Sequence, residues 1–429
     1  MAQHKAGTAP RILYITYHLP MDDEPGAFRP WVEARLLAEA GFEVTVITSA
    51  VQYMTGTMIG SGSGWCRDEI RDGIRILRVW TITDYRRSIA RRILNYLIFA
   101  LLAALAALIK VRSRVHSIFA ATDPIFFMPF LLIVSAIKRA PIILDERDLF
   151  PDTAIAVGIV KEGWLTWLVF TMQQFLRHRA ISLLAATPGI RRRLIGYGHD
   201  PARIHVLLNA DPYLSLSQMP PVPQKVAQYR LQFSSLACYA GGFGHVNDVG
   251  TIIRAAAELR LRDDLGFLIV GGGERLDEYV NLARELDVRN IEFLGALPRT
   301  TTRAILAQCD VCLQALPSDP FFGGTLTSKT FDYFGVGAAV VFAGEGDTAD
   351  LLRESGAGIV VPAQNAKEMA AAVVQLVEDN ALRNRMARAA ITWFTSHITL
   401  PNCLRIIQVA IPHPQSHSPI VTPQPESLG

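Results

Sequence analysis

Short apolar runs alternate with amphipathic stretches along the first half of this 429-residue chain. Residues 11–16 and 42–48 have the apolar, β-branched character of buried strands, and residues 28–40 between them repeat apolar positions with a helical period. Further short strands are expected at residues 74–79, 117–120 and 141–144. Strands that alternate with helices are joined by crossovers, so the pattern predicts an α/β domain with a parallel sheet.

The same alternation resumes after a proline-rich stretch at residues 219–223, with strands expected at 236–240, 265–270, 291–294, 311–315 and 339–342. We therefore predict two Rossmann-like, doubly wound domains, at residues 1–212 and 213–386. Residues 387–411 are expected to form helices that return to the first domain. The tail, residues 412–429, is rich in proline, serine and threonine without an apolar period, which favours disorder.

A long apolar run, residues 93–109, is the strongest departure from this pattern. It is shorter than the roughly 20 residues of a spanning helix, and a crossing would separate the strands on its two sides. Three readings follow: a transmembrane pass, which these two facts disfavour, a crossover helix buried in the first domain, and a helix lying in a membrane interface, which we prefer. Residues 125–137 and the side chains of Trp164 and Trp167 would extend that surface. The cations that flank the run are Arg86, Arg87, Arg91, Arg92, Lys110, Arg112 and Arg114.

Charge and cysteine content limit the classes of partner and the cellular compartment. A net charge of +3 with 19% charged residues is too mild for nucleic acid as the main partner. Five scattered cysteines indicate reduced thiols, and Cys309 and Cys312 alternate with apolar residues as in a buried strand. The first residues lack the apolar run of a secretory signal. We expect a cytoplasmic protein, associated peripherally with an anionic membrane surface at the inner face of the plasma membrane.

Two glycine-rich turns directly follow expected strands of the second domain. Gly241, Gly242 and Gly244 follow one strand, and Gly271 and Gly272 follow the next. Glycine lets the backbone approach a ligand closely, and amides at the start of a helix suit phosphate, although glycine also simply ends strands. Neither turn has the GxGxxG spacing of a dehydrogenase.

A polar loop at residues 322–333 leads into a short helical stretch. It is similar to a phosphate-binding P-loop, but a serine stands where the P-loop needs its second glycine, which disfavours an NTPase. Ser328 and Lys329 are expected to meet an anion at the helix start, and Asp332 to accept hydrogen bonds from vicinal hydroxyls. A ligand with a diphosphate joined to a ribose would use both the anion site and the carboxylate.

Three further runs, residues 267–274, 291–298 and 309–317, resemble the C-terminal domain of retaining GT-B glycosyltransferases of family four. Residues 328–337 are similar to the serine-lysine-led variant in enzymes that build bacterial surface polysaccharides and sugar-amine conjugates. Residues 145–152 and 186–190 are compatible with the N-terminal domain of that family. The resemblance implies two domains facing each other across a cleft.

It also implies retaining transfer of a sugar from a UDP- or GDP-sugar to a lipid-linked or small-molecule acceptor, with no metal or other cofactor. Lys329 would stabilise the leaving diphosphate. The glycines of both turns, together with Gly295, Ser328 and Asp332, would bind the donor.

On the first domain, the loop after the first strand holds Gly26, Phe28 and Arg29 just before a helix, which is a cleft-facing position in this architecture. Gly26 and Phe28 are expected on the acceptor side. Arg29 is expected to touch a diphosphate, with a solvated arginine as the alternative. Asp148 is expected to orient the acceptor hydroxyl, although the neighbouring residues 145–147 are equally placed.

Three positions depart from the family. With Asp332 at the second of two characteristic glutamate positions, the first falls on Gly324. The arginine and lysine that often hold the donor diphosphate fall on Gly242 and Asn247. These losses leave open a subfamily with a rearranged donor site, which we favour, or a weakened or inactive enzyme acting as a partner or scaffold. A phosphate-cofactor enzyme of another doubly wound family is the third possibility.

Overall fold

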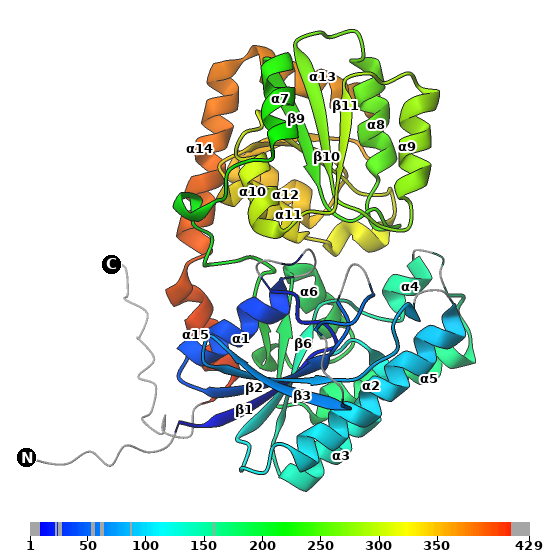
Figure 1. Cartoon of the computed structure of the whole chain (residues 1–429), viewed down its shortest axis with the longest axis vertical. Coiled ribbons are helices and arrows are strands. Elements are labelled where there is room, and N and C mark those ends of the chain that lie inside the picture. The colour runs from blue at the N-terminus through cyan, green and yellow to red at the C-terminus, as the bar shows by residue number, and fades with distance from the viewer. Residues whose placement is uncertain are drawn as a thin grey trace, which may run out of the picture.

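The computed structural model describes residues 9–412, except 22, 23, 25–27, 53–55, 61–63, 86, 87, 157 and 159. It contains one eight-stranded and one six-stranded β-sheet, in two domains stacked along the long axis of the molecule (Figure 1). The two sheets share no strand among the described residues, so the prediction of two α/β domains is confirmed. Residues 413–429 of the expected disordered tail lie outside the described part.

The first domain has the strand order β3-β4-β2-β1-β5-β6-β7-β8. All neighbouring strands are parallel except β3, which pairs antiparallel with β4 at the sheet edge. Its strands are β1 (Arg11–Ile15), β2 (Glu43–Ser49), β3 (Cys66–Arg71), β4 (Ile74–Val79), β5 (Ser117–Ala121), β6 (Ile142–Glu146), β7 (Ser182–Ala185) and β8 (Ile204–Val206). Its helices are α1 (Arg29–Glu39), α2 (Ile89–Ile109), α3 (Met128–Lys138), α4 (Asp152–Ala156), α5 (Trp164–Arg179) and α6 (Pro188–Gly196).

The second domain has the all-parallel order β11-β10-β9-β12-β13-β14, which starts in the middle and winds outward in both directions. In such sheets ligands bind at the carboxyl ends of the strands where the winding reverses, here between β9 and β12. Its strands are β9 (Ser235–Ala240), β10 (Leu265–Val270), β11 (Ile291–Gly295), β12 (Val311–Ala315), β13 (Ala339–Ala343) and β14 (Gly358–Val361). Its helices are α7 (Gln224–Gln232), α8 (Val249–Glu258), α9 (Leu276–Glu285), α10 (Arg299–Leu306), α11 (Ser328–Gly335), α12 (Asp347–Ser355) and α13 (Ala366–Glu378).

Both faces of the first sheet are buried. Because successive side chains of a strand point in opposite directions, one strand contributes to the cores on both faces. In β1, Leu13 and Ile15 pack in the core that holds the inner side of α2, whereas Ile12 and Tyr14 pack in the core beneath α1. The second sheet is likewise covered on both sides. This two-sided burial explains why the central strands were recognisable as short continuous apolar runs.

The last two helices belong to different domains. Helix α14 (Asn380–His397) packs against α11 and β13 of the second domain, and α15 (Leu400–Ala410) packs against α1 and β8 of the first. The chain therefore returns to the first domain at α15, later than residue 387. Cys403 and Ile407 are buried there, so both ends of the described chain contribute to the core beneath α1.

Four strands were not predicted. Strand β3 is an edge strand with the charged sequence CRDEIR and is only partly buried, so it carries no apolar period. Strands β7, β8 and β14 have three or four residues each, too few for a period to appear. Their positions are set by pairing with neighbouring strands, which the local sequence does not encode.

The docking of α15 predicts a stability difference between two positions on that helix. Ile407→Ala should lower the free energy of unfolding by about 2–5 kcal/mol, because the side chain of Ile407 is fully buried in the core beneath α1. Val409→Ala, where the side chain is 57% exposed, should change it by less than about 0.5 kcal/mol. Urea unfolding followed by circular dichroism measures both, and equal effects would mean that α15 does not pack as described.

Candidate active site

A cavity of about 1170 Å³ lies between the two domains, at the carboxyl ends of strands from both sheets. Its walls contain most of the residues that the sequence predicted for the site. The predicted residues on its wall are Phe28, Asp148, Gly241, Gly242, Gly244, Gly271, Gly272, Ser328, Lys329 and Asp332. Gly26 lies outside the described residues.

The two glycine turns touch each other. Gly271 has φ +139°, and a Cβ atom there would lie 1.8 Å from the carbonyl oxygen of Gly241. A Cβ atom on Gly241 would lie 2.7 Å from Cε of Lys329. Glycine at these two positions therefore lets the turns and the lysine side chain share one small space. Gly295 is not on the cavity wall, and its carbonyl oxygen instead accepts a hydrogen bond from the amide of Gly271 at 2.8 Å.

Lys329 lies in the first turn of α11 and is buried. Its amino group donates a hydrogen bond to Oδ1 of Asn247, whose Nδ2 donates to the carbonyl oxygen of Gly242 at 3.0 Å. Burial lowers the pKa of Lys329 to about 8, because no carboxylate compensates its charge. Thr327, the residue before α11, makes no side-chain cap to the helix amides. The start of α11 thus offers an ammonium group and uncapped amides to an anion in the cavity.

Asp332 is part of a buried cluster of four charges that sequence analysis did not foresee. Its Oδ1 accepts hydrogen bonds from Nη2 of Arg299 at 2.7 Å and from Nε of Arg303 at 2.9 Å. Asp211 completes the cluster, with its Oδ2 at 2.9 Å from Nη1 of Arg303 and 3.3 Å from Nη1 of Arg299. Burial alone would raise the pKa of Asp332, but the two guanidinium groups outweigh it and hold that pKa below its usual value.

The cluster reaches across to the first domain through Arg299. The guanidinium carbon of Arg299 lies 3.0 Å from the centroid of the Phe28 ring, a close cation–π contact between the domains. Burial lowers the pKa of Arg299 to about 10, so the residue remains charged at neutral pH. Both side chains line the cavity.

Arg29 was expected to touch a diphosphate, but it does not line the cavity. It is buried between α1 and the carboxyl end of β6, where Nη2 lies 2.8 Å from Oδ1 of Asp145 and Nε lies 2.8 Å from Oε1 of Glu33. Its Nη1 donates to the carbonyl oxygen of Leu207 at 2.8 Å. These contacts tie α1 to β6 and to the chain after β8.

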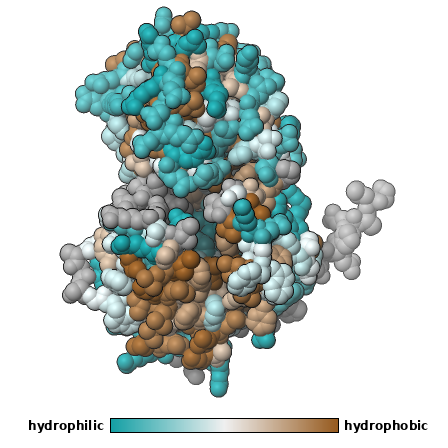
Figure 2. All heavy atoms as spheres, turned by 90° about the vertical axis from the view of Figure 1, so that its right-hand side faces the viewer, coloured by the Kyte–Doolittle hydropathy of each residue, from teal (hydrophilic) through white to brown (hydrophobic). Residues whose placement is uncertain are grey.

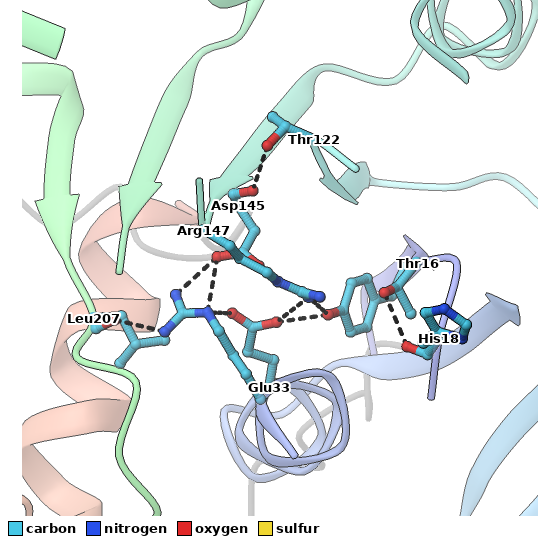
Figure 3. A network of polar contacts seen from close by, with 9 residues as sticks. Thr16, His18, Glu33, Thr122, Asp145, Arg147 and Leu207 are labelled. Carbon is cyan, nitrogen blue, oxygen red and sulfur yellow. Dashed lines mark hydrogen bonds and ion pairs between the residues drawn. The ribbon is translucent and has the colours of Figure 1, made fainter. Parts of the chain in front are cut away.

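The same network supports a different arginine at the cavity. Arg147 donates from Nη2 to the hydroxyl of Tyr14 at 2.7 Å and to Oε2 of Glu33 at 3.1 Å, and from Nε to Asp145 (Figure 3). Unlike Arg29, it lies on the cavity wall. Glu146 is fully buried against Arg177, with contacts of 2.8 and 2.9 Å. Of residues 145–148, Arg147 and Asp148 line the cavity.

Asp148 stands on the first-domain side of the cavity together with Asp123 and His18. Desolvation inside the cleft raises the pKa of Asp148 to about 6, and the negative charge of Asp123 adds to the effect. The hydroxyl of Thr153 donates to Oδ1 of Asp148 at 3.4 Å, which partly opposes the shift. A carboxylate with this pKa is ionised at neutral pH and accepts hydrogen bonds.

Gly324, which stands where the family has a glutamate, lies where the backbones of the two domains are in contact. Its carbonyl oxygen accepts a hydrogen bond from the hydroxyl of Thr187 at 3.1 Å, and a Cβ atom on Gly189 would lie 2.2 Å from the same oxygen. A Cβ atom on Gly324 itself would lie 3.1 Å from Cα of Gly189. Nearby, Arg193 donates to the carbonyl oxygen of Phe321 at 3.0 Å. A side chain at position 324 would therefore require Gly189 to shift by a few tenths of an ångström.

Comparisons with known proteins match both halves of the chain. Residues 32–210 match the glycosyl transferase 4-like domain, and residues 232–393 match the glycosyl transferases group 1. The chain is 22% identical over 308 residues to the probable glycosyltransferase WbjE of Pseudomonas aeruginosa, an alignment that covers 68% of this chain and 75% of WbjE.

Two solved structures are similar over nearly the whole chain. HepE from Anabaena, in complex with UDP and glucose, has a TM-score of 0.66 at 12% identity, with 93% of this chain and 98% of that chain covered. WaaG, a glycosyltransferase involved in lipopolysaccharide biosynthesis, has a TM-score of 0.62 at 15% identity, with 93% and 99% covered. At these identities the likeness concerns the fold, and the expected GT-B architecture is confirmed. Since the two matched domains together take up most of the chain, the protein belongs to the group 1 glycosyltransferases.

Proposed function

We propose that this glycosyltransferase moves a sugar, with retention, from a UDP- or GDP-sugar to a lipid-linked or small-molecule acceptor in polysaccharide or glycoconjugate biosynthesis. The observation that carries the proposal is the start of α11, where Lys329 and uncapped amides face the cavity beside two glycine turns. That combination suits a diphosphate. The related fold of HepE holds UDP and glucose, and WaaG takes part in lipopolysaccharide biosynthesis, which supports both the donor and the acceptor class.

The diphosphate is the group that most needs stabilisation. As the bond between the anomeric carbon and the phosphate oxygen breaks, negative charge develops on the leaving diphosphate. In the proposed mode, the ammonium of Lys329 and the amides at the start of α11 stabilise this charge without a metal. Asn247, where the family often has a lysine, instead orients Lys329 through its amide oxygen.

The ribose of the nucleotide is assigned to Asp332. Oδ1 of Asp332 is occupied by Arg299 and Arg303, while Oδ2 has a single weaker described contact, 3.4 Å from Nε of Arg299. Oδ2 is therefore the oxygen available to vicinal hydroxyls. The glycine turns would lie against the diphosphate and the sugar because they present backbone without side chains.

On the acceptor side, Asp148 would accept the hydrogen bond of the attacking hydroxyl, and Phe28 would form part of the wall. A new bond forms between the acceptor oxygen and the anomeric carbon, and the leaving phosphate takes the acceptor proton. Attack on the face that the phosphate leaves accounts for retention without a carboxylate nucleophile. Arg147, fixed by Asp145 and Glu33, is the first-domain cation available to an anionic acceptor or donor.

A catalytically inactive protein that acts as a partner or scaffold is the second candidate, because Gly324 replaces a characteristic glutamate. A panel of UDP- and GDP-sugars tests the two functions in an assay of donor hydrolysis and transfer. Turnover of at least one donor supports catalysis. Saturable donor binding with no turnover across the panel and a range of acceptors would overturn the enzymatic function.

Lys329→Gln should reduce kcat/KM about 10- to 150-fold, because it removes a charge-assisted contact of about 1.5–3 kcal/mol to the diphosphate. Lys225→Gln is the matched control, since Lys225 is 61% exposed in a surface pair with Glu292 and should have no effect. Steady-state kinetics with the best donor of the panel measure both variants. Unchanged kinetics for the Lys329 variant would place the diphosphate elsewhere.

Asp332→Ala should weaken stability as well as donor binding. It leaves Arg299 and Arg303 with only Asp211 to balance them, so the free energy of unfolding should fall by about 3–5 kcal/mol. Asp350→Ala breaks an exposed pair with Arg353 and should cost no more than about 1 kcal/mol. Guanidinium unfolding gives the comparison. If the Asp332 variant is as stable as the control, the four-charge cluster does not hold α11 in place.

The pH profile of kcat/KM should fall on both sides of neutrality. Below about pH 6 Asp148 becomes protonated and can no longer accept the acceptor hydrogen bond, and above about pH 8 Lys329 loses its charge. Asp148→Asn should lower the plateau and remove the acidic limb while keeping the basic one. An acidic limb that survives in this variant would assign it to another group.

A further inference from the structure

The first domain carries a broad apolar surface on the side opposite the returning helix α15. Helix α3 packs between α2 and α5, and the outer sides of these three helices form this surface, here called the helical apolar face (Figures 1 and 2). Its exposed members are Ile93, Leu94, Leu97, Leu101, Leu105 and Ile109 of α2, Ile133 and Ile137 of α3, and Trp164, Leu165, Trp167, Leu168, Met172 and Phe175 of α5.

Helix α2 departs from the pattern expected where a helix faces water. Its buried inner side consists mainly of small side chains such as Ala100, Ala103 and Ala107, with Phe99 as the large apolar side chain buried among them. Other large side chains point outward, with Leu94 52% and Leu101 48% exposed. A helix on a water-facing surface buries its large apolar residues and exposes polar ones. Soluble monomers rarely expose contiguous apolar areas of this kind without a partner.

The fold prevents α2 from crossing a bilayer. The window Ala90–Ile109 is long and apolar enough to span one, with a mean hydropathy of 2.2, and 39% of it is buried inside the protein. However, α2 connects β4 to β5, which belong to the same sheet, and it packs against β2 and β4. A crossing would place β4 and β5 on opposite sides of the bilayer, although both belong to one sheet. Only the outer side of α2 is therefore available to a bilayer.

The charges around the helical apolar face select an anionic partner. None of α2, α3 and α5 contains an aspartate or glutamate. Glu162, which is exposed, lies two residues before α5. The cations at the helix ends that are exposed are Arg91, Arg92, Lys110, Arg112, Arg114, Arg139 and Arg179. A second copy of the chain would bring these same cations face to face, whereas anionic lipid head groups attract them.

We propose that the helical apolar face docks the protein peripherally on the surface of an anionic lipid bilayer, with Trp164 and Trp167 in the head-group region and the flanking cations on lipid phosphates. Arg92 and Tyr96, in the first turns of α2, also line the interdomain cavity. Docking therefore brings the cavity to the bilayer surface. If the cavity holds the proposed glycosyl transfer, docking favours a lipid-linked acceptor. Only this statement about the acceptor rests on the proposed function.

The test is co-sedimentation of the full chain with vesicles of phosphatidylcholine, with and without phosphatidylglycerol. The wild type should bind the mixed vesicles more strongly, and high salt should weaken that binding. Trp164→Ser/Trp167→Ser should reduce binding at least about tenfold, because these side chains are 77% and 66% exposed and supply apolar contact. Leu231→Ser/Leu261→Ser, at positions 89% and 86% exposed on the second domain, should bind like the wild type.

Arg112→Gln/Arg114→Gln should lose most of the preference for phosphatidylglycerol while retaining the fold, because both side chains are exposed. Vesicle binding that is absent in the wild type, or equal in the tryptophan variant and the control, overturns the proposal. So does a wild-type dimer that becomes monomeric in the tryptophan variant with unchanged vesicle binding, because the face would then be an interface between two copies. Donor turnover is measured separately, and its absence would leave the result on docking intact.

Discussion

The active-site geometry depends on the buried cluster formed by Asp211, Arg299, Arg303 and Asp332. Removing four charges from water is costly, and the cost is offset only while each carboxylate faces both guanidinium groups. The cluster joins α10, α11 and the connection after β8, and Arg299 carries it to Phe28 of the first domain. It thereby fixes the helix that carries Lys329 and the relative position of the cavity walls.

The second constraint is the absence of side chains at a few glycines. Gly241 and Gly271 let two turns meet beside Lys329, and Gly189 and Gly324 let the two domains meet backbone to backbone. The departure from the family at position 324 lies at this contact. A side chain there would press against Gly189, which would have to shift by a few tenths of an ångström.

Much of the fold was predictable because buried parallel strands are continuous apolar runs. Ser328, Lys329 and Asp332 were expected to lie together, and do so on the cavity wall, because they form one local motif within α11. The partners of these residues were not predicted. Arg29 pairs with Asp145, 116 positions away, and Arg299 meets Phe28 in the other domain, so neither role is visible in the local sequence. The apolar run of α2 was visible as well, but only the packed structure shows which of its apolar side chains face the core and which, such as Leu94 and Leu101, are exposed.

The central claim is that the start of α11 holds the diphosphate of a nucleotide-sugar donor. The most direct measurement is a crystal structure of the protein with UDP, or with the best donor of the panel. The account predicts phosphate oxygens within hydrogen-bond distance of the Lys329 amino group and the Ser328 amide, beside the turns at Gly241 and Gly271. A nucleotide bound elsewhere in the cavity, with Lys329 still donating only to Asn247, would contradict it.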